Sequence, residues 1–95
     1  MEISLYKRVG NFAENKDIAK EIRINQIIPT LEKGEIVILN FTNIKSATQS
    51  FIHALISEVI RKKGINVLDS IYFKNCNSTI QKIIEIVTEY MQDSF

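Results

Sequence analysis

Cysteine and long apolar runs are the features that this 95-residue sequence most clearly lacks. Cys76 is the only cysteine, which excludes an intrachain disulfide and a zinc site built from cysteines. A single cysteine fits a reducing compartment, and we expect a cytoplasmic protein. No apolar run approaches the roughly 18 residues that cross a bilayer, and the first ten residues lack the pattern of a secretory signal. The sequence therefore predicts a soluble protein that does not associate with membranes.

Glycine is also scarce, and no charge of one sign predominates. Gly10, Gly34 and Gly64 stand alone, so the sequence contains neither a P-loop nor the dinucleotide-binding fingerprint. Twelve Lys and Arg residues balance 11 Asp and Glu residues, and the net charge of +1 provides no long-range attraction for nucleic acid. The acidic residues are scattered singly. We therefore expect no cofactor and no metal site.

Catalysis would have to use His53, the only histidine, or Cys76. His53 lies at the edge of an apolar helix stripe, which favours a partly exposed structural histidine over a general base. Cys76 precedes a helix N-terminus, where a thiol pKa can be lowered, but a small packing residue is the better interpretation. We expect that the protein is not an enzyme. A catalytic accessory that uses these two residues is the weakest alternative.

Three strand patterns alternate with three helix patterns along the chain. Residues 1–7 alternate with a period of two, and a third strand is expected within residues 67–74. Residues 36–39 form a continuous β-branched run, which predicts a central strand covered on both faces. We predict one small α/β domain over residues 1–95. Its order is β-α-β-α-β-α, with helices packed on a mostly parallel sheet.

The first two helices carry most of the sequence signals. Asn15 is the expected N-cap of the first, whose two apolar stripes lie on nearly opposite sides of an ideal helix. One straight helix cannot bury both stripes, so we expect a break or kink between Arg23 and Pro29. The second helix is expected over residues 46–63, with one clean apolar stripe.

The turn that leads into residues 46–63 is the first candidate for a functional surface. Ser46 and Gln49 fit a capping box with Ser46 as the N-cap, and Thr48 is the rival N-cap. Together with Ser50, these hydroxyl side chains gather at the positive end of the helix. Capping alone explains them, and an anion-binding or phosphorylation site is the sharper interpretation.

The helix face opposite the apolar stripe is the second candidate. It carries Ser50, Ala54, Ser57 and Arg61, at spacings of four, three and four. Outward helix faces usually carry Glu, Lys and Gln, whereas this one is mostly small, so another backbone could approach it closely. We weigh a partner-docking face evenly against chance.

Binding of nucleic acid or a nucleotide is the main alternative function. Tyr6, Tyr72 and Phe73 could form a stacking platform on an open sheet face, although no RNA-binding motif accompanies them. A basic and aromatic sheet face would favour nucleic acid. A bare helix face from Ser50 to Arg61 would favour a protein partner.

Several of these segments together resemble a known family. The block Gly34–Phe41, with Ile44 and the segment Ser46–Phe51, resembles the STAS-like family of small bacterial domains of unassigned function. The segments Asn15–Arg23 and Ile71–Asn75 also fit that family. The resemblance covers nearly the whole chain and implies a STAS-like fold.

That family is similar in turn to the STAS domains of anti-sigma-factor antagonists. In those domains an Asp-Ser-Ser-Gly segment follows the central strand, and its second serine is phosphorylated by a kinase of the histidine-kinase-like ATPase fold. The segment Thr48–Phe51 occupies the equivalent place here, and only Ser50 matches the pattern. The resemblance therefore implies Ser50 as a phosphorylation site.

We accordingly expect a non-enzymatic regulatory module that binds another protein. The resemblance implies an ATPase of the histidine-kinase-like fold or an anti-sigma-type regulator as the partner, and a homo-oligomer is left open. The expected partner-binding residues lie at the N-terminal end and on the outer face of the helix over residues 46–63. They are Ser46, Thr48, Gln49, Ser50, Ala54, Ser57 and Arg61.

Overall fold

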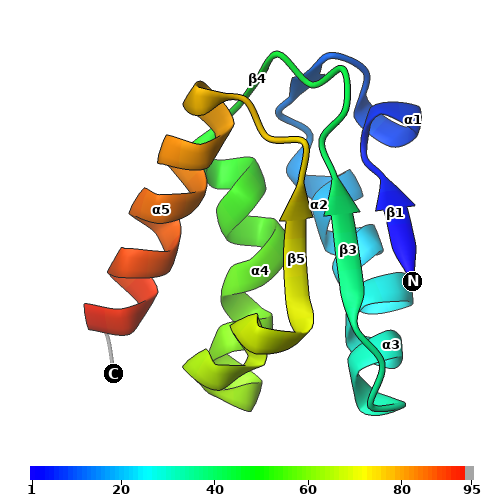
Figure 1. Cartoon of the computed structure of the whole chain (residues 1–95), viewed down its shortest axis with the longest axis vertical. Helices are drawn as coiled ribbons and strands as arrows, with labels where there is room; N and C mark the ends of the chain where they lie inside the picture. Colours follow the sequence, from blue (N-terminus) through cyan, green and yellow to red (C-terminus); the bar gives the residue numbers. More distant parts are fainter. Residues whose placement is uncertain (94–95) are drawn as a thin grey trace.

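A computed structural model describes residues 1–93 and places the three main strands in one layer (Figure 1). These strands are β1 (Glu2–Ser4), β3 (Val37–Asn40) and β5 (Ile71–Lys74). They form a parallel sheet in the order β1-β3-β5, so the apolar run of β3 lies in the centre. The predicted α/β class, a mostly parallel sheet with helices packed on it, is confirmed.

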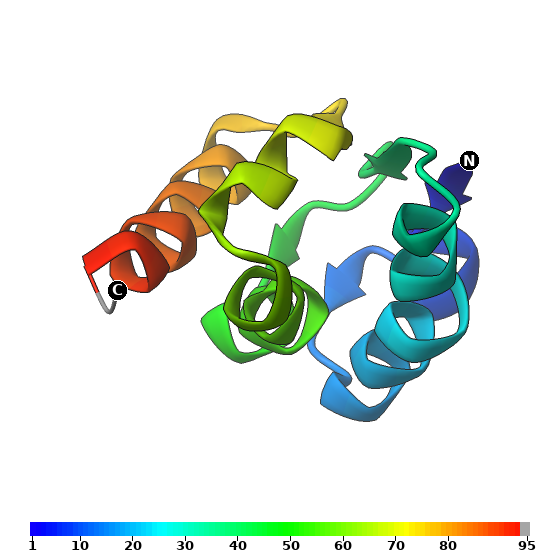
Figure 2. The ribbon, with the colours of Figure 1, turned by 90° about the horizontal axis from the view of Figure 1, so that it is seen from below.

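The remaining elements connect these strands and cover one side of them. They are α1 (Tyr6–Val9), β2 (Phe12–Ala13), α2 (Lys16–Ile22), the π-helical segment η1 (Arg23–Ile27), α3 (Ile28–Glu32), β4 (Ser46–Ala47), α4 (Gln49–Lys63), the 3-10 helix η2 (Ile65–Ser70) and α5 (Ser78–Asp93). Figure 2 shows α2, α4 and α5 on the same side of the sheet, with α4 between the other two. The fold therefore has two layers.

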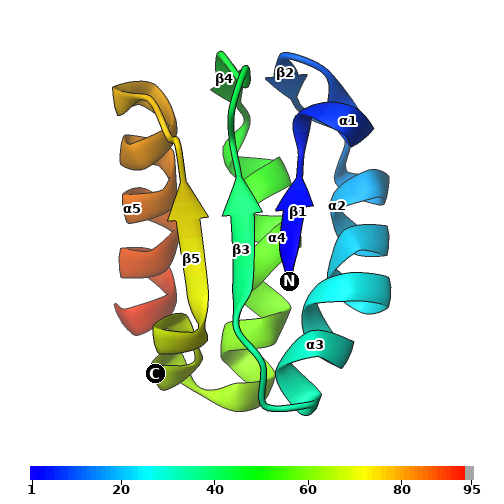
Figure 3. The ribbon, with the colours of Figure 1, turned by 45° about the vertical axis from the view of Figure 1, so that its right-hand side comes forward.

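The two faces of the sheet differ because the helices cover only one of them. Ile3, Leu39 and Phe73 form one cross-strand row, and their side chains face the helices. Figure 3 shows no helix in front of the opposite face. The side chains on that open face are at least partly exposed: Glu2, Ser4, Ile38, Asn40, Tyr72 and Lys74. The prediction that β3 is covered on both faces is therefore wrong.

The predicted break between Arg23 and Pro29 takes the form of the π-helical segment η1. A π-helix has a wider turn than an α-helix, with hydrogen bonds from residue i to i+5. Ile22, just before this turn, and Ile27, at its end, are five residues apart, and both side chains are 0% exposed. Ile24, between them, is 48% exposed. The wider turn changes the helical phase, so that α2 buries Ala19 and Ile22 while Ile28 and Leu31 of α3 pack, partly buried, against the same core.

A second, very short pair of strands fixes the start of α4. β2 and β4 pair in parallel, with Phe12 opposite Ser46 and Ala13 opposite Ala47. This pair lies beyond the ends of β1 and β3 (Figure 3). The N–H of Thr48 then donates to the carbonyl of Ala13 at 3.0 Å. The first turn of α4 is thus held by the N-terminal part of the chain.

Candidate interaction site on the helix layer

The N-cap of α4 is Thr48. Its Oγ1 accepts a hydrogen bond from the N–H of Phe51 at 3.0 Å, and its backbone is extended. Ser46 lies two residues earlier, within β4. Of the two N-caps that the sequence allowed, Thr48 is therefore the correct one. The helix expected over residues 46–63 begins at Gln49 because Ser46 and Ala47 pair with β2 instead.

The first turns of α4 present polar side chains to solvent. Gln49, Ser50 and His53 are all exposed. This confirms that Ser50 lies exposed in the first turn, as its position on the helical wheel predicts. The first turn contains no acidic residue. An added negative charge at Ser50 would therefore meet the positive helix end without a like charge in that turn.

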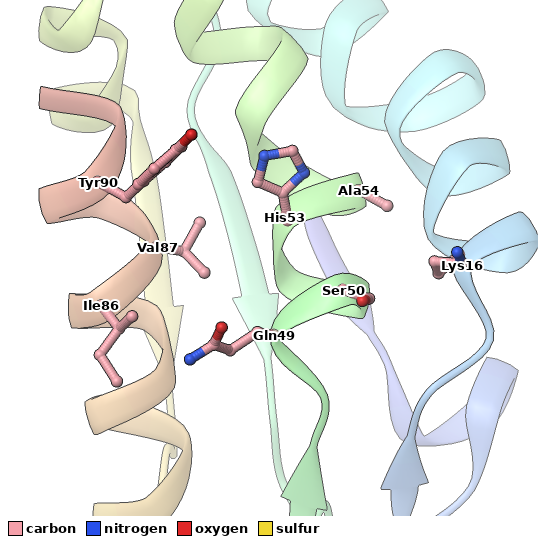
Figure 4. A pocket seen from close by; sticks show the side chains of 8 residues that line it. All are labelled: Lys16, Gln49, Ser50, His53, Ala54, Ile86, Val87 and Tyr90. Carbon is pink, nitrogen blue, oxygen red and sulfur yellow. The ribbon is translucent and has the colours of Figure 1, made fainter. Parts of the chain in front are cut away.

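A groove of about 470 Å³ runs along this exposed side of α4 (Figure 4). Its lining residues come from α2, α4 and α5: Lys16, Gln49, Ser50, His53, Ala54, Ile86, Val87 and Tyr90. Gln49 points toward α5, whereas Ser50 points toward the side of Lys16 (Figure 4). On the α5 wall, Ile86 is 42% exposed and Tyr90 is 63% exposed. The groove thus combines a polar wall on α4 with an apolar wall on α5.

Sequence reasoning missed both exposed apolar residues of this groove. Helical spacing places Tyr90 in the apolar stripe of α5, but the residues that α5 buries are Ile80, Ile84, Val87 and Met91. Tyr90 lies beside that stripe and is exposed. The sequence does indicate Ile86 as a surface residue, because it is an apolar residue on a helix face that otherwise carries Gln, Lys and Glu.

The small-residue face of α4 is covered by the chain itself at Ser57, and the expected exposure of that side chain is wrong. Ser57 is 2% exposed, and its Oγ lies 3.3 Å from Nδ1 of His53. From η1, Nη1 of Arg23 donates to the carbonyl oxygen of Ala54 at 2.8 Å. The close approach that the small side chains predicted does occur, and the approaching segment is η1.

The predicted interaction residues are therefore divided among four places. Arg61 is exposed near the far end of α4 and forms an ion pair with Glu58. Such exposed pairs contribute about 0–1 kcal/mol. The other predicted residues form three groups: Gln49, Ser50 and Ala54 line the groove, Ser46 and Thr48 hold the start of the helix, and Ser57 is buried.

His53 and Cys76 lie in different grooves. His53 lines the groove between α4 and α5, whereas Cys76 lines a second one beside β5. Burial raises the pKa of the Cys76 thiol to about 11, which keeps the thiol protonated near neutral pH. The position before a helix N-terminus has therefore not activated this cysteine.

A polar network at the carboxyl end of the sheet was not anticipated. Asn40 donates through Nδ2 to Glu2 at 2.8 Å, and Nζ of Lys74 lies 3.3 Å from the same carboxylate. These two contacts lower the pKa of Glu2, and the hydrogen bond from Asn40 has the larger effect. Asn75 donates to the hydroxyl oxygen of Thr42 at 2.8 Å. The sequence offered no signal for this network, because its members lie in three separate segments.

The aromatic residues named for stacking do not share one surface. Tyr72 is 52% exposed on the open sheet face. Phe73 faces the helices instead, with its ring centroid 6.5 Å from that of Phe41, and Tyr6 belongs to α1. The nearest cation on the open face, Lys74, is paired with Glu2. The open face is therefore neither strongly basic nor rich in aromatic side chains.

Residues 1–93 contain neither a membrane-spanning helix nor a cluster of metal ligands. No helix in that range is both long enough and apolar enough for a membrane span. Over the same range, His, Cys, Asp and Glu side chains form no group of three that could hold a metal ion.

Comparison with protein families gives a match for residues 19–81, about two thirds of the chain, to the STAS-like domain of unknown function. The chain belongs to this family. The part of this STAS-like domain that matches includes all three groove residues of the predicted set, whereas Ile86 and Tyr90 lie beyond its end. No curated protein and no solved structure gave a match.

Proposed function

We propose that this STAS-like domain is a regulatory module that binds a partner protein in the groove between α4 and α5. The observation that supports this function is the exposed apolar wall of Ile86 and Tyr90 beside the first turn of α4. Apolar side chains that gather on a surface typically mark interaction sites, and tyrosine is enriched among the residues that dominate binding. The exposed polar groups of Gln49 and Ser50 would supply the rim.

The partner class that we propose is an ATPase of the histidine-kinase-like fold. It is supported by the similarity between the STAS-like family and anti-sigma-factor antagonists. Phosphorylation of Ser50 would add a charge of about −1.5 to −2 at the positive end of α4. The fold would tolerate this group because Ser50 is exposed. The phosphate would therefore affect partner binding and leave the fold intact, because the partner would meet a bulky anion within the groove.

Paired isoleucine variants test the groove. The protein would serve as bait for affinity capture from its host, as wild type and as Ile86→Asp. Ile24→Asp is the matched control, since Ile24 is 48% exposed but lies on η1 outside the groove. We expect Ile86→Asp alone to lose the captured protein while circular dichroism stays unchanged. Equal capture by all three proteins would contradict the proposed site.

Ser50 variants test the phosphorylation step separately. Ser50→Asp should weaken binding of the captured protein, whereas Ser50→Ala should preserve it. Both variants should fold normally, because exposed substitutions usually change stability by less than about 0.5 kcal/mol. If both variants bind like wild type, Ser50 is only a residue of the helix start.

A second candidate function rests on the uncovered sheet face. Tyr72 projects from this face with 52% exposure, so a base could stack on it. Fluorescence anisotropy with labelled single-stranded RNA would test this function. Binding at moderate salt that Tyr72→Ala abolishes would support it, whereas no binding would exclude it.

A further inference from the structure

The outer edge of β5 is hydrogen-bonded to no other strand of residues 1–93. In a parallel strand, backbone groups of successive residues point alternately toward the two neighbours. The carbonyl of Lys74 accepts from the N–H of Phe41 at 2.8 Å, so Lys74 and Tyr72 direct their backbone groups toward β3. The N–H and C=O of Phe73, and the C=O of Ile71, therefore point away from the sheet.

A helix runs alongside this free edge without closing it. α5 packs against α4 and contacts β4, and a groove of about 460 Å³ separates it from β5. Figure 3 shows α5 beside β5. The strand side contributes Phe73, Asn75 and Cys76, and the α5 side contributes Gln81, Ile84, Glu85 and Thr88. Both walls of this edge groove thus contain apolar atoms.

The opposite edge of the sheet, along β1, is protected in a different way. The groove beside β1 is lined by the charged side chains of Glu2, Lys7 and Arg8, together with Ile3, Ser4 and Gln26. Charged side chains at a sheet edge disfavour the addition of another strand, and here Glu2 comes from β1 while Lys7 and Arg8 come from α1. The β5 groove has a single charged liner, Glu85, which forms no ion pair within residues 1–93. The two edges are therefore not equivalent.

We propose that the groove between β5 and α5 binds an extended peptide segment of another protein, which adds to the sheet as a fourth strand beside β5. An added strand lies about 4.8 Å from its neighbour and hydrogen-bonds to the free groups of Phe73 and Ile71. An apolar side chain of the peptide would pack between Phe73 and Ile84. A basic side chain next to it would complement Glu85.

The flanking helix argues against a second copy of this chain as the occupant. Pairing with the β5 edge of a second copy would bring a second α5 to the joined edge together with the second β5. The groove lies between β5 and the α5 of the same chain, and an extended peptide would bring no helix of its own. The neutral thiol of Cys76 leaves the strand wall uncharged at this point, which suits an apolar peptide side chain.

A substitution that fills the groove tests the proposal. A library of short linear peptides would be panned against the full chain, and recovered peptides would be measured by fluorescence anisotropy. Thr88→Phe places a large side chain in the groove. Thr79→Phe is the matched control, because Thr79 is exposed and nine residues away, about two and a half turns, on the opposite side of α5. We expect at least a tenfold loss of affinity with Thr88→Phe and none with Thr79→Phe.

Amide hydrogen exchange on the wild-type chain gives a test that needs no variant. Peptide binding should slow exchange at Phe73, whose N–H is free, while Tyr72 and Lys74 are already bonded to β3. Three results would overturn the proposal: no peptide enriched above background, equal affinity for Thr88→Phe, or unchanged exchange at Phe73. The site lies outside the α4–α5 groove, so failure of either proposal leaves the other standing.

Discussion

Arg23 in η1 donates a hydrogen bond to the backbone carbonyl of Ala54 in the middle of α4, at 2.8 Å. The contact joins two segments 31 residues apart in the chain and lies partly buried. The contact brings Arg23 of η1 to the backbone of α4 at Ala54, where a small side chain leaves room for it. The middle of the small face, at Ala54 and Ser57, is thus part of the internal packing of the domain.

Loss of the Arg23 contact should destabilise the domain. Hydrogen bonds from charged groups typically contribute about 1.5–3 kcal/mol, and the Ala54 carbonyl retains its place in the α4 helix, so we expect Arg23→Met to cost about 1–2 kcal/mol. Arg8→Met is the control, because Arg8 forms only an exposed ion pair with Glu21, worth at most about 1 kcal/mol. Urea unfolding monitored by circular dichroism measures both. Equal costs would show that the Arg23 contact contributes nothing specific.

Burial of Ser57 leads to a second prediction. Ser57→Glu would place a carboxylate, with only the exposed His53 nearby, where the side chain is 2% exposed, at a cost of about 3 kcal/mol or more. Ser50→Glu, on the same helix but exposed, should change the free energy of unfolding by less than about 0.5 kcal/mol. Thermal unfolding of the two variants separates these outcomes. A Ser57→Glu protein as stable as wild type would mean that this face is accessible after all.

The N-cap assignment can be checked in the same way. Thr48→Ala removes the acceptor for the N–H of Phe51 and should lower the free energy of unfolding by about 1 kcal/mol. Ser46→Ala should have less than half that effect, because Ser46 does not cap α4. A larger effect at Ser46 than at Thr48 would restore the capping box that the sequence first suggested.

The Cys76 thiol supplies a prediction about pH. Burial raises its folded pKa from 9.0 to about 11, so the folded protein holds this proton more tightly than the unfolded chain does. The associated stability is present below pH 9 and is lost as the pH rises toward 11. Alkylation by iodoacetamide should therefore be slow at pH 8 and rise with a midpoint near 11. The same chain in urea should show a midpoint near 9, and identical profiles would contradict the burial of this thiol.

Local signals in the sequence predicted most of the fold. Asn15 accepts from the N–H groups of Asp17 and Ile18, as its N-cap position indicates. The order of the strands and the break before Pro29 also follow from apolar periodicity, which depends only on nearby residues. The expected cover on both faces of β3 failed, because a continuous apolar run does not report how many helices are available to cover it.

The candidate site was less predictable, since it depends on which helices become neighbours. The exposure of Ser50 followed from the helical wheel of α4 alone. Burial of Ser57 and exposure of Tyr90 depend on where η1 and α5 pack against that helix, and no residue within α4 carries this information. The polar network around Glu2 likewise requires the parallel alignment of three strands.

The π-helical turn of η1 is also a place where the chain can lose one residue without a change in the core. It holds one residue more than an α-helical turn needs, and Asn25 within it is exposed. Removal of Asn25 would leave Ile22 and Ile27 four positions apart, which is the spacing at which an α-helix places two side chains on one face. A relative that is one residue shorter here would keep the same core. Alignments of this family should therefore open a single-residue gap between Arg23 and Ile27 and leave the isoleucines on either side in register.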